Sequence, residues 1–155
     1  MSHVAVVAVK IKDLKSLAKA CQNLGLEFRE NQKTYKWFGR HVGDYPRPKG
    51  FTAADDGKCD HAISVPGNTN AYEVGVCKSR DPADGKDTHQ LLWDFYAGGH
   101  GLQAKVGNNC DALVHEYTKE VTRKQLAQLA KAKGYTMAED YNDQTGETTI
   151  KLRRY

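Results

Sequence analysis

The amino-acid sequence predicts an α+β fold: a mainly antiparallel twisted sheet with helices on one face. Both ends of the chain show the same order of elements, which is an extended segment, an amphipathic helix and two further extended segments. Both helices also end at a glycine followed by an apolar residue, Gly25-Leu26 and Gly134-Tyr135. We therefore expect two pseudo-repeated βαββ units around an inserted β-meander.

The predicted repeat units span about residues 3–40 and 116–155, and the inserted segment spans 41–115. With 155 residues, the chain has the length of one domain that can bury a core without disulfides or a structural metal. We therefore expect a single domain over 1–155.

The first unit is predicted to contain strands at 4–11, 27–30 and 34–40 and a helix at 13–24. Residues 4–9 are apolar at every position, which is typical of a central strand covered on both faces. The helix is indicated by apolar residues spaced for one helical face, namely Leu14, Leu17, Ala18, Cys21 and Leu24. In the segment 34–40, Tyr35 and Trp37 are expected to point inward.

The second unit is predicted to contain a strand at 117–121, a helix at 123–133 and strands at 136–141 and 148–154. Thr122, with Gln125 three residues later, has the pattern of a capping box and predicts the helix start. Residues 142–146 have the composition of a hairpin turn. In the last strand, Ile150 and Leu152 are expected to face inward and Lys151 and Arg153 outward.

The inserted segment begins with a long loop at 43–58 that is rich in proline and glycine. Strands are predicted at 61–65, 72–78 and 91–96, and a short helix at 111–116. The run Gly98-Gly99-His100-Gly101 follows the last of these strands and lacks the spacing of a phosphate-binding loop. We interpret it as a flexible turn.

Composition and charge restrict the class of protein. No apolar run approaches the roughly 18 residues that span a membrane, and no secretory signal pattern is present. The chain has four cysteines without close pairing, which favours reduced thiols in the cytoplasm. The formal net charge is +4.

A basic surface with an aromatic ring is the first candidate binding site. If the strands at 34–40 and 148–154 belong to one sheet, Lys36, Phe38 and Arg40 can share a face with Lys151 and Arg153. Nucleic-acid-binding sheets combine cations that contact phosphate with rings that stack on bases. Binding of nucleic acid or a phosphorylated ligand is therefore one functional alternative.

Cys59, His61 and Cys77 form the candidate metal site. Cysteine and histidine are the usual zinc ligands, but structural zinc sites show tight ligand pairs, and the only close pair here is Cys59 with His61. A small metal-dependent or thiol enzyme is a second alternative. No residue has the local signature of a catalytic group, so no catalytic residue and no cofactor are predicted.

Several short motifs carry a family resemblance. They are Met-Ser-His at 1–3, the 10–14 segment Lys-Ile-Lys-Asp-Leu, the 23–26 segment Asn-Leu-Gly-Leu, the 72–76 segment Tyr-Glu-Val-Gly-Val and the 150–155 segment Ile-Lys-Leu-Arg-Arg-Tyr. In these motifs the chain resembles domain-of-unknown-function family 1257, found in cyanobacteria, red-algal plastids, other bacteria and some phages. The chain departs from the family in longer loops at 43–58 and 81–89. The resemblance implies an accessory or adaptor role and an AAA-type ATPase as a partner.

The expected function is that of a small, non-enzymatic cytoplasmic binding or adaptor protein that acts through protein–protein contacts. The sheet face, the sheet edge and the loop at 43–58 are the expected contact surfaces. No membrane association is expected, and a homo-oligomer remains open.

Overall fold

The computed structural model describes residues 3–40, 43, 45–142 and 144–154. The positions outside this description are Met1, Ser2, His41, Val42, Asp44, Asp143 and Tyr155, which include parts of the predicted loop, the hairpin turn and the terminal family motifs. The chain divides into two compact units, Met1–Tyr117 and Thr118–Tyr155.

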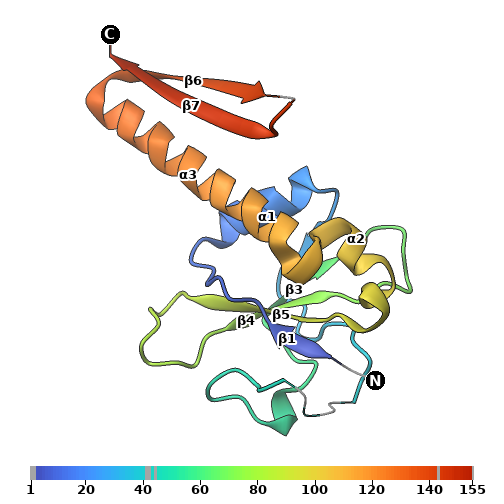
Figure 1. Ribbon diagram of the computed structural model, residues 1–155. Helices are drawn as coiled ribbons and strands as arrows, with labels where there is room; N and C mark the ends of the chain where they lie inside the picture. Colours follow the sequence, from blue (N-terminus) through green and yellow to red (C-terminus); the bar gives the residue numbers. More distant parts are fainter. Residues whose placement is uncertain (1–2, 41–42, 44, 143, 155) are drawn as a thin grey trace. The chain divides into compact units, whose positions relative to one another are not determined.

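The first unit contains a five-stranded sheet with the order β1-β5-β4-β3-β2 (Figure 1). Its strands are β1 (Val4–Val6), β2 (Glu27–Arg29), β3 (His61–Ser64), β4 (Val74–Lys78) and β5 (His89–Asp94). All neighbouring strands are antiparallel. The predicted α+β class and mainly antiparallel sheet are confirmed, and β3, β4 and β5 form the predicted meander.

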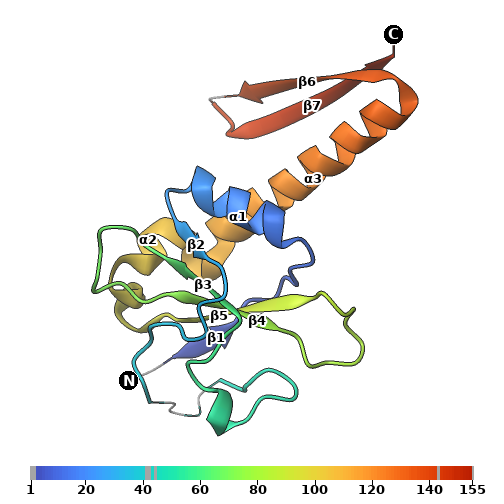
Figure 2. The ribbon, with the colours of Figure 1, turned by 180° about the vertical axis from the view of Figure 1, so that it is seen from behind.

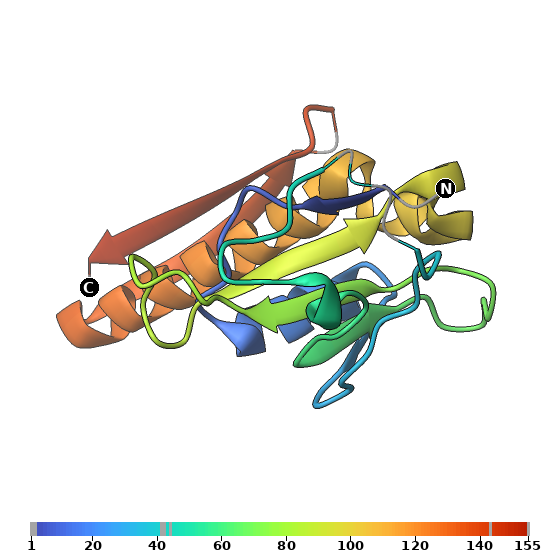
Figure 3. The same cartoon turned by 90° about the horizontal axis from the view of Figure 1, so that it is seen from below.

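Helices cover one face of this sheet, as predicted, and a long loop covers the other (Figures 1 and 2). The helices are α1 (Leu14–Asn23), α2 (Leu102–Val106) and the beginning of α3 (Asp111–Lys133). The loop contains the short 3₁₀ turn η1 (Ala53–Asp55) and crosses the sheet in the view from below (Figure 3). The sheet is therefore the middle layer of the unit.

The alternation of side chains along the strands explains how both faces are buried. On one face, Ile63, Val74, Val76, Leu91 and Trp93 are all at most 2% exposed. On the loop face, Ala62, Cys77 and Leu92 form a cluster with Tyr35 and Cys59. The exposed fraction of Tyr35 is 5%, and Trp37 packs against the same cluster, so the predicted inward direction of both rings is confirmed.

Helix α1 agrees with its prediction at both ends. The carboxylate of Asp13, the N-cap residue, accepts a hydrogen bond from the backbone N–H of Ser16 at 3.1 Å. At the other end, Gly25 has a φ of +70°, and the N–H of Leu26 donates to the carbonyl of Cys21 at 2.8 Å. Leu17 and Cys21 are buried, as their helical spacing predicts.

The prediction that the first strand is central is wrong, because β1 is an edge strand of only three residues. The N–H of Val7 still bonds to the carbonyl of Leu91, and Ile11 pairs with His89, but the residues between leave the sheet. Val4 and Val6 are half-buried against the loop-face cluster and Val7 is buried, whereas Ala8 and Val9 are exposed, so the apolar run is not covered along its whole length.

The predicted strand at 34–40 is also absent. Only one isolated bridge, Thr34 with Lys58, pairs this segment with the chain. Tyr35 donates its N–H to the carbonyl of Gly57 at 3.0 Å. The segment therefore lies over the sheet as part of the loop layer, where side-chain packing and not a ladder of hydrogen bonds holds it.

Residues 117–121, predicted as a strand, lie inside α3, which is continuous from Asp111 to Lys133. The predicted capping box at Thr122 is wrong for the same reason. The local preference of Tyr and Val for strands is overridden by packing. Tyr117 is 6% exposed, and its hydroxyl accepts hydrogen bonds from the N–H groups of Lys12 and Asp13 at 3.0 and 3.2 Å.

The second unit contains the rest of α3 and a hairpin of β6 (Tyr135–Asn142) and β7 (Glu147–Arg154). The predicted turn between them is confirmed: Gly146 donates its N–H to the carbonyl of Asn142 at 2.8 Å. Ile150 and Leu152 are half-buried, whereas Lys151 and Arg153 are exposed, as expected.

The predicted repeat of two βαββ units is wrong. In the first unit, β1 and β2 lie at opposite edges of one sheet, whereas β6 and β7 are direct neighbours in another. The helix of the second unit also has no strand before it, because its N-terminal extension is helical. The two ends of the sequence share a pattern of hydrophobicity but not a topology.

Candidate functional site

The carboxylate of Asp94, at the end of β5, joins two distant segments of the first unit to the residues that directly follow β5. Its Oδ1 accepts hydrogen bonds from the backbone N–H groups of His3 and Tyr96, each at 3.0 Å. Its Oδ2 accepts one from the N–H of Phe38, also at 3.0 Å. The side chain is fully buried. Asp94 therefore fixes the backbone beneath three ring-bearing residues.

These segments bring together a group of rings that we call the aromatic surface: His3, Phe38, Tyr45, Phe95, Tyr96 and His100. Stacked rings of His3 and Phe95 have centroids 5.3 Å apart. The edges of Phe38 and Tyr45 contact Tyr96 and Phe95, with centroids 5.6 and 5.4 Å apart. Phe38, Tyr45 and Tyr96 are 45%, 41% and 37% exposed. Large apolar rings are therefore presented to solvent in fixed mutual orientations.

The aromatic surface ends in a left-handed turn within η2 (Tyr96–Gly101). Ala97, Gly98, Gly99 and His100 have φ values of 49°, 64°, 63° and 52°. This conformation costs about 1–2 kcal/mol at a residue with a side chain, so tertiary contacts must hold it. The carbonyl of Gly99 accepts from the N–H of Tyr72 at 2.9 Å, and the imidazole of His100 lies 4.8 Å from the Tyr72 ring. The predicted flexible turn is thus a defined structure.

Three of the predicted binding residues lie on or beside this surface. Phe38 is part of it. Lys36 and Arg40, two residues before and two residues after Phe38, are both exposed. The ammonium of Lys36 donates to the carbonyl of Thr69, and its backbone N–H donates to the carboxylate of Glu73 at 2.8 Å. Lys36 is therefore engaged by its own unit, and Arg40 is a second exposed cation, two residues after Phe38.

The other two predicted binding residues, Lys151 and Arg153, lie on β7 in the second unit. They were expected to share a sheet with Lys36, Phe38 and Arg40. The expectation is wrong, because β7 pairs with β6 in a separate two-stranded sheet and residues 36–40 form no strand. The structure does not build a basic face from one sheet.

The three predicted metal ligands are engaged in hydrogen bonds. The thiols of Cys59 and Cys77 donate to the carbonyls of Gln32 and Lys58 at 3.2 and 3.4 Å. His61 accepts the N–H of Asn31 on Nδ1 at 2.9 Å. Within residues 3–40, 43, 45–142 and 144–154, no three His, Cys, Asp or Glu side chains are grouped to hold a metal ion.

Burial also controls the chemistry of the thiols. Desolvation raises the pKa of Cys59 to about 12 and raises the pKa of Cys77 still further, with neighbouring acidic groups adding to both effects. A thiol with such a pKa is protonated at neutral pH and is a poor nucleophile.

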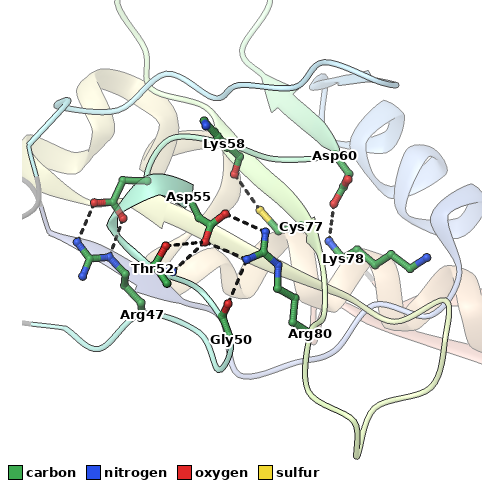
Figure 4. Close-up of polar contacts among 10 residues, drawn as sticks. Arg47, Gly50, Thr52, Asp55, Lys58, Asp60, Cys77, Lys78 and Arg80 are labelled. Atoms are coloured by element: carbon green, nitrogen blue, oxygen red, sulfur yellow. Dashed lines mark hydrogen bonds and ion pairs between the residues drawn. The ribbon is translucent and has the colours of Figure 1, made fainter.

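A second polar cluster braces the loop layer (Figure 4). The guanidinium of Arg80 binds both carboxylate oxygens of Asp55, at 2.8 and 2.9 Å, and the carbonyl of Gly50 at 3.1 Å. It also lies 4.3 Å from the centre of the Phe51 ring. Arg47 makes a similar two-bonded pair with Asp56. The Arg80 contacts tie η1 to the chain just after β4, and the Arg47–Asp56 pair closes the loop on itself.

An open cavity of about 270 Å³ lies beside this brace and is lined in part by Lys58, Asp60, Cys77, Lys78 and Arg80. Arg80 lines this cavity, but its guanidinium donates hydrogen bonds to Asp55 and Gly50. We therefore interpret this arginine as a structural residue that holds the loop layer in place. The hydrogen bond from Arg80 is the main cause that lowers the pKa of Asp55 to about 2.

Sequence reasoning identified Phe38 but not the rest of the aromatic surface. Phe95 and Tyr96 stand together at the end of a predicted strand, which is a weak signal for exposed rings. The bond from His3 to Asp94 spans 91 positions and that from Phe38 spans 56, so no local pattern could indicate them.

Comparisons with known proteins give no relative from which to transfer a function. No family model matches the chain, and neither a curated protein nor a solved structure does so. The resemblance to domain-of-unknown-function family 1257 therefore stays a prediction. Of the helices in the described ranges, none is long and apolar enough to cross a membrane.

Proposed function

We propose that this chain is a small, non-enzymatic cytoplasmic binding protein that engages a protein partner through its aromatic surface. The observation that carries the proposal is the exposure of Phe38, Tyr45 and Tyr96, which are 45%, 41% and 37% accessible. Phe38 contacts Tyr96, Tyr45 contacts Phe95, and the His3 ring contacts both Phe95 and Tyr96. Tyr and Phe are enriched in the centres of protein–protein interfaces, where a few buried rings supply most of the binding energy.

The fixed position of the rings supports this proposal. Asp94 holds the N–H groups of His3, Phe38 and Tyr96, so these residues are ordered before a partner arrives. Ordering a flexible side chain on binding costs about 0.5–1.5 kcal/mol. A surface that is already ordered avoids much of this cost, which favours tight binding by a small contact area.

The chemistry of the rings indicates a partner with apolar side chains at its contact surface. The AAA-type ATPase implied by the family resemblance is the first protein to test. The aromatic surface is the contact site that we assign to this interaction, in place of the loop at 43–58 alone.

Binding measurements with a double variant, Phe38→Ser with Tyr96→Ser, test the proposal. Partners are captured from an extract of the source organism on the immobilised wild-type chain, identified by mass spectrometry and then purified. Titration calorimetry with a purified partner should show a dissociation constant at least about tenfold higher for the double variant, because rings at an interface centre contribute most of the affinity.

Leu129→Ser is the matched control, since Leu129 is 40% exposed and lies outside the aromatic surface. It should bind the partner as the wild type does. Equal affinity of the wild type and the double variant would contradict the proposal.

Single-stranded nucleic acid is the second candidate ligand, because exposed rings also stack on bases. The specific observation is that Phe38 and Tyr96 are exposed and Arg40 is exposed two residues beyond Phe38. Base stacking on an aromatic side chain contributes about 1–3 kcal/mol per base, and an exposed arginine can contact the phosphate.

Fluorescence polarisation with a labelled oligothymidylate tests this candidate. Binding should weaken as salt rises, and Phe38→Ala with Arg40→Glu should abolish it. Lys151→Glu with Arg153→Glu is the informative control, because it removes the two β7 residues of the originally predicted basic face. If only this control weakens binding, the ligand contacts β7 and not the aromatic surface.

A further inference from the structure

The outer strand of the second unit has features of an unoccupied interface. Every residue of β6 after Tyr135 is exposed, whereas alternate residues of β7 are half-buried. Met137 and Tyr141 of β6 are 38% and 64% exposed. Figures 1 and 2 both show β7 on the side of α3 and β6 on the outside. Among the described residues, β6 has no strand neighbour other than β7.

The register of the hairpin divides the side chains of β6 between two faces. Tyr135, Met137, Glu139 and Tyr141 share one face with the half-buried residues of β7. Glu139 on this face accepts a hydrogen bond from Arg123 of α3 at 3.1 Å. Thr136, Ala138, Asp140 and Asn142 lie on the opposite, fully exposed face.

A free edge of this length favours addition of another strand. About every second residue of an edge strand directs its N–H and C=O groups away from the sheet, and a two-stranded hairpin is only marginally stable by itself. Natural edges are usually short or carry charged residues, above all lysine, and proline. β6 is eight residues long and contains no lysine or proline; its charged residues are Glu139, which is paired with Arg123 of α3, and Asp140.

We propose that β6 pairs in antiparallel fashion with β6 of a second copy of this chain, about a twofold axis through Ala138. The two hairpins would then form one four-stranded sheet. A second copy is the occupant because β6 is complementary to itself in this register. Tyr135 lies opposite Tyr141 of the second copy, and this aromatic pair occurs twice. Cross-strand aromatic pairs contribute about 0.2–1 kcal/mol each.

Charges disfavour the register whose axis lies at Glu139. In the proposed register, each Asp140 lies opposite Thr136 of the second copy, and each Glu139 lies opposite Met137. A shift of the axis to Glu139 would place two glutamates opposite each other, which is unfavourable, and would leave Tyr135 without a cross-strand partner. If the axis lay between two residues, odd-numbered positions of one strand would lie opposite even-numbered positions of the other. The apolar face of one hairpin would then adjoin the polar face of the other.

Paired variants at position 138 test both the dimer and its register. Ala138 is exposed in the single chain, so a polar side chain there is compatible with the fold of one copy. In the proposed dimer, Ala138→Lys places two lysines directly opposite each other, and Ala138→Glu does the same with two glutamates. Native mass spectrometry and sedimentation velocity should show a wild-type dimer and monomers for each variant, with the dissociation constant raised at least about tenfold.

An equimolar mixture of the two variants should restore a dimer, and mass spectrometry should identify it as the mixed species. Only a register in which position 138 meets itself gives this result. Ala132→Lys and Ala132→Glu are the controls, since Ala132 is exposed on α3 in the same unit and should leave the dimer unchanged. A monomeric wild type, a dimer that survives Ala138→Lys, or failure of the mixed species to form would each overturn the proposal.

Discussion

The ring of Tyr35 lies against the backbone of Gly75 on the loop face of the sheet. A Cβ atom at position 75 would stand 2.5 Å from the Cδ1 atom of Tyr35. The backbone of Gly75 is not in the left-handed region, so the requirement for glycine comes from space alone. This contact is what allows the extended segment around Tyr35 to pack directly on β4.

Gly75→Ala should therefore destabilise the first unit by about 1–3 kcal/mol, the usual cost of an added methyl group in a packed core. Chemical denaturation followed by tryptophan fluorescence measures this change. Gly85→Ala is the matched control, because its Cβ would meet only the Thr88 hydroxyl at 3.6 Å. Equal stability of the two variants would contradict the described packing of Tyr35.

Asp94→Ala should lower the free energy of unfolding by about 3 kcal/mol or more, since it leaves three backbone N–H groups without their acceptor. The aromatic ring signals of the surface should also lose their dispersion in proton NMR spectra. Asp87→Ala, at an exposed carboxylate just before β5, should change neither quantity. Unchanged ring signals in Asp94→Ala would show that the aromatic surface is ordered by other contacts.

The Arg80–Asp55 pair predicts a specific acid sensitivity. The hydrogen bond from Arg80, with a smaller contribution from the Thr52 N–H, lowers the pKa of Asp55 from 3.8 to about 2, so the folded state favours the ionised carboxylate. The stabilising contribution is complete above the unfolded pKa and is lost as the pH falls from about 4 to about 2. Denaturation between pH 2 and 6 should show this loss in the wild type, and a smaller one in Asp55→Asn. Identical pH profiles would contradict the pairing.

The thiols should be unreactive in the folded protein. All four cysteines are free and buried, and burial raises the pKa of Cys21, Cys59 and Cys110 to about 12. Labelling with iodoacetamide at pH 8 should be slow until denaturant is added, when four sites react. Fast labelling of a single thiol in the native state would contradict this prediction and would favour the thiol-enzyme alternative.

Elements with local signals could be predicted from the sequence. Helix α1 has an N-cap aspartate, a regular apolar face and a terminal glycine, and the β6–β7 turn has residues suited to tight turns. Both are determined by neighbours within a few positions, so their patterns remain readable without the fold.

Elements controlled by distant contacts could not be predicted. Residues 117–121 have strand-forming side chains, yet the Tyr117 hydroxyl bonds to backbone groups more than a hundred positions away and the segment is helical. The apolar run at 4–9 suggested a central strand, but β1 is a half-buried edge strand whose Val4 and Val6 contact the distant loop-face cluster. The aromatic surface was only found in part, because Asp94 assembles it from separate segments.

The left-handed turn has a consequence for the engineering of this chain. Ala97 and His100 adopt a backbone conformation that glycine occupies without strain. A selection for heat resistance would therefore favour glycine at position 97, whereas glycine at position 100 would also remove the contact of the imidazole with the Tyr72 ring. The outcome at position 100 would therefore report whether the contact with Tyr72 stabilises the turn by more than the strain of a left-handed histidine costs.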